Sequence, residues 1–312
     1  MTRTPGLRGR LPVKPPGERF AIDWVSEYLR EPLPAPTYPI DVTGGIGATS
    51  WGMDGNGPDP TCTTYPNGVG DCSFAGEVHY RRSKAASYGE TEQFPDSNEI
   101  VAAYLAYDDG QDVGANLADL LLYLYRAGKI LGFAPVDHTD PAAVDSAMEA
   151  FKGVYVGVDL TDDADQLFSE GLSWTVTDGQ RPDPQEGHCI LGVRATQTQR
   201  TYVTWGAEQA ATAEWSRACL REAWVILSSE DALAKVNMPA LLADINALHG
   251  TGDPAPAPAP VPAPIVAPPG PAGTPTAPSG LLQDLAARAR WVATATGQDY
   301  RGVVEWLRSH RP

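Results

Sequence analysis

A glycine-rich turn runs directly into a cysteine in the segment Asn67-Gly68-Val69-Gly70-Asp71-Cys72-Ser73-Phe74-Ala75-Gly76. The glycines predict a turn, and the apolar spacing after the cysteine predicts a helix from about Cys72 to Ala86. A thiol at the first residue of a helix lies where the helix dipole stabilises a thiolate. We therefore interpret Cys72 as a candidate nucleophile, the alternative being a buried, inert cysteine.

A histidine at the start of an apolar, β-like run is the second candidate. His188 lies in the segment Glu186-Gly187-His188-Cys189-Ile190-Leu191-Gly192-Val193, far downstream of Cys72. A strand of this kind can place an imidazole beside a thiol carried by a helix, where it acts as a general base. His79 lies two turns along the helix that begins at Cys72, and we expect it only to pack.

The periodicity predicts helices in the first part of the chain and strands in the later part, which is typical of the α+β class. Residues 41–71 are rich in Gly, Asp, Asn and Pro and are expected to form loops. Further helices are expected over 98–106, with Ser97 as the N-cap, and over 117–127 and 142–151. Strands are expected over 154–158, 189–195, 200–205 and 223–227.

These segments together resemble the papain family of cysteine peptidases over about residues 60–230. The resemblance rests on the Gly-Asp-Cys helix, the strand over 153–157, the Gly187-His188 segment, the Trp205-Gly206 turn and the final strand near 222–225. It implies a helical part followed by an antiparallel barrel-like sheet. It also implies a cysteine hydrolase, a peptidase or amidase acting on a peptide or protein substrate without a cofactor. The whole pattern looks most similar to papain-like proteins of actinobacterial phages and bacteria.

The resemblance assigns Cys72 as the nucleophile and His188 as the general base and then acid. The family's asparagine, which orients the histidine, corresponds to Val203, which cannot hydrogen bond to an imidazole. Thr204 is the candidate replacement, although a shift of one residue along a strand changes the face. Glu208 or Gln209, or no orienting residue, are the alternatives.

The family's oxyanion-hole glutamine corresponds to Pro66. Asn67, one residue later, has the required amide donor and is our candidate, with the Cys72 backbone N–H as the second donor. Because two family positions differ, a second hypothesis is a catalytically inactive papain-like module with a structural or binding role, such as a phage virion component. The Asp-Cys-Ser triplet also resembles NlpC-type cell-wall peptidases, and transglutaminase-like enzymes share the Cys-His chemistry.

Composition predicts four regions along the chain. Residues 1–40 are expected to be an extended arm with a short helix, and residues 41–252 the papain-like domain. Residues 253–280 are a Pro/Ala-rich linker that favours polyproline II. Residues 281–312 are expected to form an amphipathic helical tail that either docks on a protein partner or folds back on the acidic domain.

Charge and hydropathy bear on which partners the protein binds and where it is located. The formal net charge of −16 disfavours nucleic-acid partners and anionic membrane surfaces. The N-terminus lacks an apolar stretch typical of a signal peptide, and the run 117–125 is too short to span a membrane. We therefore expect a cytoplasmic or virion-associated protein. The cysteine and histidine spacing predicts no metal site.

Two further groups of residues are expected to be structural. The acidic stretch 159–165 is interpreted as a solvated loop. Four tryptophans are expected to lie mainly in the core, with a substrate groove as the alternative; these are Trp51, Trp174, Trp205 and Trp215.

Overall fold

The computed structural model describes residues 5–12, 22–177 and 180–248, and it divides into two compact units, residues 1–237 and 238–312. In the second unit the described element is helix α8 (Met238–Ala247). The predicted linker over 253–280 and tail over 281–312 lie outside the described residues. Within the described part of the chain, no helix has both the length and the hydropathy needed to cross a bilayer.

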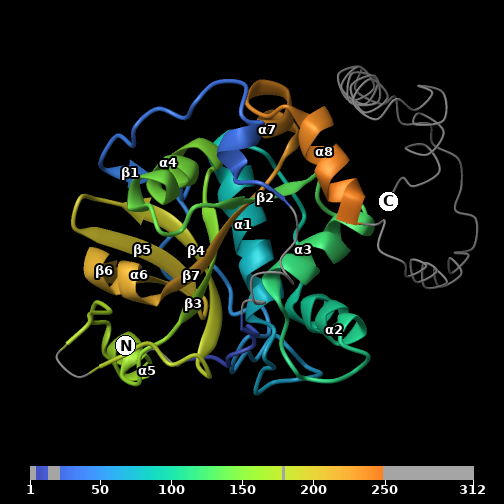
Figure 1. Ribbon diagram of the computed structural model, residues 1–312. Helices are drawn as coiled ribbons and strands as arrows, with labels where there is room; N and C mark the ends of the chain where they lie inside the picture. Colours follow the sequence, from blue (N-terminus) through green and yellow to red (C-terminus); the bar gives the residue numbers. More distant parts are fainter. Residues whose placement is uncertain (1–4, 13–21, 178–179, 249–312) are drawn as a thin grey trace, which may run out of the picture. The chain divides into compact units, whose positions relative to one another are not determined.

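A seven-stranded antiparallel sheet is the centre of the first unit (Figure 1). Its strands follow the order β2-β7-β3-β4-β5-β6, and the short β1 pairs with β4. The combination of helices with an antiparallel sheet confirms the predicted α+β class. The strands are β1 (Ile40–Asp41), β2 (Phe133–Val136), β3 (Val154–Asp159), β4 (Gly187–Ala195), β5 (Gln199–Thr204), β6 (Ala207–Thr212) and β7 (Leu220–Ile226).

Helix α1 (Cys72–Tyr88) joins the sheet to the other helices of this unit. It contacts β3, β4 and β5 on one side and α2 on the other (Figure 1). The other helices are η1 (Val25–Tyr28), α2 (Ser97–Tyr107), α3 (Leu117–Arg126), α4 (Pro141–Phe151), α5 (Ala164–Glu170), α6 (Ala213–Cys219) and α7 (Ser229–Ala234).

Local signals explain where the predicted helices begin and end. Helix α1 starts at Cys72 as predicted and ends before Gly89, whose φ of +67° suits a glycine C-cap. The prediction of Ser97 as an N-cap was wrong by one residue, because Asp96 forms a capping box with Glu99.

Some elements carry no clear local signal and were not predicted. Strand β6 reads Ala-Glu-Gln-Ala-Ala-Thr, a composition with weak β propensity, and it forms because all six residues pair with β5. Strand β2 contains Pro135 and is equally short of β-branched residues, yet it pairs along its length with β7.

Candidate active site

The candidate nucleophile lies at the junction between α1 and β4. Cys72 is the first residue of α1 and is 2% exposed. Its sulfur accepts a hydrogen bond from the backbone N–H of Cys189 at 3.4 Å. Because Cys189 directly follows His188, this contact places the backbone of the histidine strand beside the Cys72 sulfur. Cys62 and Cys72 are both free thiols.

His188 is buried and held by a hydroxyl. Its Nε2 lies 2.7 Å from Thr204 Oγ1, while its Nδ1 has no hydrogen-bond partner in the part of the chain that the structure describes. The imidazole packs on Trp205, with ring centroids 4.9 Å apart. The histidine ring is therefore fixed at one nitrogen and available at the other.

The strand register explains why Thr204, and not Val203, reaches the histidine. Val203 is the Cα partner of Leu191, so Thr204 lies on the same face of the sheet as Ile190 and His188. The two alternatives lie elsewhere: Glu208 accepts hydrogen bonds from Arg194, and Gln209 donates to the Leu172 and Ala210 carbonyls.

Burial shifts the pKa of both candidate residues toward the neutral form. Burial raises the pKa of Cys72 to about 12, and the Asp71 carboxylate acts in the same direction, whereas the Cys189 and Gly9 backbone and Arg10 oppose the shift. Burial also moves the pKa of His188 well below its usual range, and the nearby Arg8 and Arg10 cations add to this effect. In this conformation both shifts favour a thiol at Cys72 and a neutral imidazole at His188.

Several buried polar atoms around Cys72 have no hydrogen-bond partner among the described residues. They include both carboxylate oxygens of Asp71, Ser73 Oγ, His188 Nδ1 and Trp205 Nε1. Most buried polar groups in proteins are hydrogen-bonded, so each of these atoms calls for an explanation such as bound water or a functional role. A small cavity of about 10 Å³ opens at Cys72, between α1 and the sheet.

The cavity contains an amide that the sequence did not suggest. Asn56 is 2% exposed and lines the cavity with Cys72, whereas Asn67 lies in an exposed turn. Asn56 Nδ2 donates to the Leu7 carbonyl at 3.1 Å and to the Val69 carbonyl at 3.3 Å. Its only sequence signal is its place between Gly55 and Gly57.

His79 lines the same cavity, which the expectation of simple packing did not include. Its Nε2 lies 3.0 Å from the Gly52 carbonyl and 3.1 Å from Asp54 Oδ2. Its edge packs against Trp51, which is fully buried as expected for a core tryptophan.

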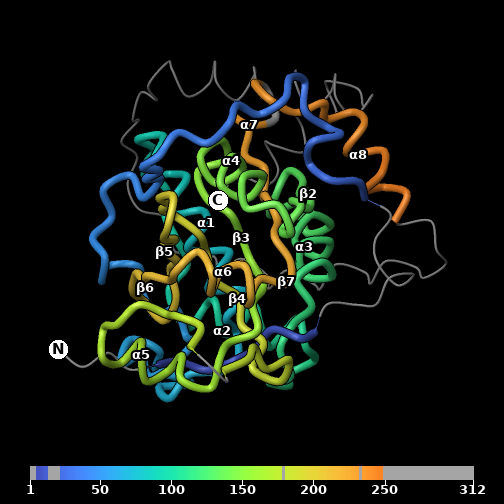
Figure 2. The backbone as a smooth tube through the Cα atoms, turned by 60° about the vertical axis from the view of Figure 1, so that its left-hand side comes forward, coloured from blue at the N-terminus to red at the C-terminus, as the bar shows by residue number. Residues whose placement is uncertain are grey.

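Residues 5–12, the N-terminal segment, cover Cys72. The segment crosses the first unit as the darkest blue stretch in Figure 2. On the helical side, Ala115 N donates to the Gly9 carbonyl at 2.7 Å and Leu11 N donates to the Ala115 carbonyl at 2.9 Å. On the sheet side, Arg10 N donates to the Gly187 carbonyl at 3.3 Å. The segment therefore bridges the two sides of the candidate site.

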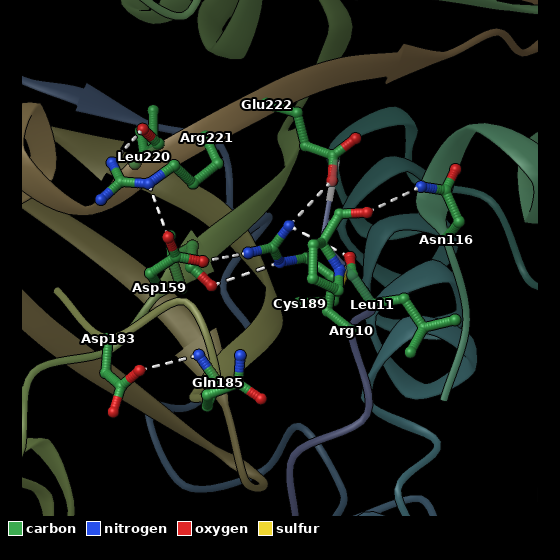
Figure 3. Close-up of polar contacts among 12 residues, drawn as sticks. Arg10, Leu11, Asn116, Asp159, Asp183, Gln185, Cys189, Leu220, Arg221 and Glu222 are labelled. Atoms are coloured by element: carbon green, nitrogen blue, oxygen red, sulfur yellow. Dashed lines mark hydrogen bonds and ion pairs between the residues drawn. The ribbon is translucent and has the colours of Figure 1, made fainter. Parts of the chain in front are cut away.

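Asp159 was wrongly included in a solvated loop. It is the last residue of β3, is buried, and forms ion pairs with Arg10 and Arg221 (Figure 3). In the described ranges, no group of three or more His, Cys, Asp or Glu side chains is arranged to hold a metal ion.

Comparison with known proteins identifies the fold. No protein-family model and no curated protein matches the sequence. The structure is similar to xylellain, a cysteine protease from Xylella fastidiosa, with a TM-score of 0.51 and 11% identity over 73% of this chain and 98% of that chain. Procathepsin L 3 from the larval midgut of Tenebrio molitor matches with a TM-score of 0.30 and 14% identity over 73% and 76% of the two chains. The likeness to xylellain shows that the chain has the fold of a papain-like cysteine protease.

Proposed function

We propose that this protein is a papain-like cysteine hydrolase that cleaves an amide bond. The proposal rests on the contacts of His188 and its neighbour Cys189. Thr204 contacts Nε2 of His188 and leaves Nδ1 without a partner among the described residues, and the backbone N–H of Cys189 contacts the Cys72 sulfur. A thiol at a helix N-terminus beside a fixed imidazole is the arrangement that nucleophilic thiol catalysis requires.

The residues act as follows in the proposed reaction. With Nε2–H donating to Thr204, Nδ1 of His188 takes the proton of Cys72. The thiolate attacks the amide carbonyl carbon, and the Cys72 N–H and the Asn56 amide stabilise the oxyanion. The imidazolium then protonates the leaving amine, and water hydrolyses the thioester with His188 as its base.

The described conformation is, in this proposal, a resting form. The N-terminal segment buries Cys72 and brings Arg8 and Arg10 near His188, and both effects oppose formation of an imidazolium. Displacement of the segment removes both effects, so that the pKa of His188 rises and that of Cys72 falls. The thiolate–imidazolium pair forms only then.

A cleavable N-terminal segment tests the proposal. A recognition sequence for a site-specific protease is placed within residues 13–21 of the full chain, and hydrolysis of a broad fluorogenic peptide library is measured before and after the cut. We expect hydrolysis only after the cut. It should be absent in Cys72→Ala and retained in Cys219→Ala, which alters a buried thiol elsewhere.

Two results would overturn the proposal. One is a cut protein that hydrolyses no peptide and whose Cys72 thiol has ordinary reactivity, which would favour the inactive binding module. The other is hydrolysis that persists in Cys72→Ala.

A further inference from the structure

Arg10 of the N-terminal segment lies in a buried ionic site beside the candidate nucleophile. Its guanidinium forms ion pairs with Asp159 and, at 3.3 Å, with Glu222, and its Nε donates to the Val158 carbonyl (Figure 3). The Arg10 side chain is 1% exposed. Its burial would be unfavourable without these partners.

The two carboxylates are oriented by the sheet itself. Asp159 Oδ2 accepts a hydrogen bond from Arg221 Nε at 2.6 Å, and Glu222 Oε2 accepts one from Trp224 Nε1 at 2.9 Å. Because these partners belong to β7, the carboxylate pair (Asp159 and Glu222) keeps its geometry when Arg10 leaves. The pair is therefore a preformed acceptor for a guanidinium.

Glycines shape the path on which the backbone of the N-terminal segment lies. A Cβ on Gly9 would lie 1.4 Å from the Gly70 carbonyl oxygen, so a larger residue does not fit there. A Cβ on Gly187 would lie 2.3 Å from the Arg10 carbonyl oxygen, and one on Gly157 would lie 2.7 Å from Arg10 Cδ. The bound segment therefore requires glycine at the position of Gly9, and the glycines of the sheet leave room for a long side chain at the next position, that of Arg10.

We propose that this site binds extended peptides containing a Gly-Arg pair, with the arginine held by Asp159 and Glu222. The N-terminal segment is the intramolecular occupant of the same site. Calling the bound peptide a substrate rests on the proposed function, whereas the binding preference does not. The ligand class is a basic, glycine-containing peptide, which also suits the acidity of the chain.

Peptide binding tests this preference without catalysis. The protein is the full chain carrying Cys72→Ala and Arg10→Ala, so that nothing is cleaved and the carboxylate pair is vacated. The probe is fluorescein-labelled Gly-Leu-Arg-Gly-Arg-Leu amide, and the matched peptide has norleucine in place of the second arginine. Fluorescence polarisation should show about tenfold or tighter binding of the arginine peptide, as expected for charged hydrogen bonds.

Two further substitutions locate the preference. Glu222→Gln should reduce it, whereas Glu186→Gln, which contacts Arg8 at 2.7 Å, should leave it unchanged. Equal affinity for the two peptides, or a preference that survives Glu222→Gln, would overturn the inference. A clear preference in a protein that hydrolyses nothing would overturn only the proposed function.

The cut chain described above provides a second measurement that keeps Arg10. There the arginine peptide should compete with rebinding of the severed N-terminal segment about tenfold better than the norleucine peptide does. Equal competition would contradict the inference even if the Arg10→Ala chain failed to fold.

Discussion

The two ends of helix α1 differ in the hydrogen bonding of their buried polar groups. Toward the C-terminal end, Lys84 forms an ion pair with the fully buried Asp231. Tyr80 donates to the Phe151 carbonyl at 3.2 Å, and Ser83 Oγ lies 2.7 Å from the Val42 carbonyl oxygen. Every one of these groups is hydrogen-bonded, so this end holds the helix in place.

At the N-terminal end of the same helix, several buried polar groups have no hydrogen-bond partner among the described residues. Asp71 and Ser73 are fully buried, and their side-chain oxygens have no hydrogen-bond partner. Cys72 lies between them, and the free Nδ1 of His188 belongs to the strand packed against it. A protein tolerates such a concentration of unbonded groups mainly where function requires it. The far end is therefore structural, and the near end is the one that we propose to be reactive.

The largest expected effect is at the near end. Replacing Cys72 with alanine should lower amide hydrolysis by the cut chain by about 10⁴-fold or more, because the nucleophile is lost. Thermal unfolding should change little. The same substitution at Cys219 serves as the control, and comparable loss of activity there would indicate damage to the fold rather than to the chemistry.

A large effect on stability is expected at the far end. Lys84→Met leaves Asp231 buried with Lys235 at 3.1 Å as its remaining cation. The free energy of unfolding in urea should fall by about 3 kcal/mol. Activity per folded molecule should be unchanged, and a selective loss of activity would contradict the division of roles along α1.

Removing the hydroxyl that holds His188 should have a smaller effect on catalysis. Thr204→Val keeps the shape of the side chain but removes the contact with Nε2. We expect kcat to fall by about 10²-fold because the imidazole loses its fixed tautomer and orientation. Thr204→Ser should restore most of the rate, and equal rates for the valine and serine variants would exclude the hydroxyl from this role.

The smallest expected effect is a gain in stability at the near end. Burial raises the pKa of Asp71 well above its usual value, with Asp54 and Asp112 contributing. A raised folded-state pKa means that stability is complete below the unfolded pKa and is lost as pH rises through the folded one. Asp71→Asn should therefore gain about 1 kcal/mol at pH 8 and nothing at pH 3 in urea unfolding. A gain of equal size at both pH values would contradict this account.

The two ends of α1 and the residues around them also differ in how far the sequence predicts them. Helix α1 was predicted, and the two candidate residues were selected, because glycines, helical spacing and residue type are local signals. The choice between Val203 and Thr204 depends on strand register, which local pattern does not specify. Asn56, which lines the cavity with Cys72, was missed because nothing in its neighbourhood distinguishes it from other loop residues.

The ionic site shows the same limit more clearly. Arg10, Asp159 and Glu222 lie far apart in the sequence. The two carboxylates meet because β3 and β7 are neighbours in the sheet, and Arg10 reaches both of them from the N-terminal segment. Acidic stretches are usually solvated, so the composition of residues 159–165 predicted an exposed Asp159, whereas this side chain is buried. Contacts of this range follow from topology rather than from local sequence.

We propose that Cys72 and His188 form a reactive pair once the N-terminal segment is displaced. The most direct test is the rate of iodoacetamide alkylation of Cys72 against pH, read by peptide mass, in the intact and cut chains. We expect an unreactive thiol in the intact chain, where burial raises the pKa of Cys72 to about 12. In the cut chain we expect an apparent pKa of Cys72 well below the ordinary value of about 8.5, which rises again in His188→Ala. A thiol of ordinary pKa in the cut chain, unchanged by the loss of His188, would show that the two residues do not form a reactive pair.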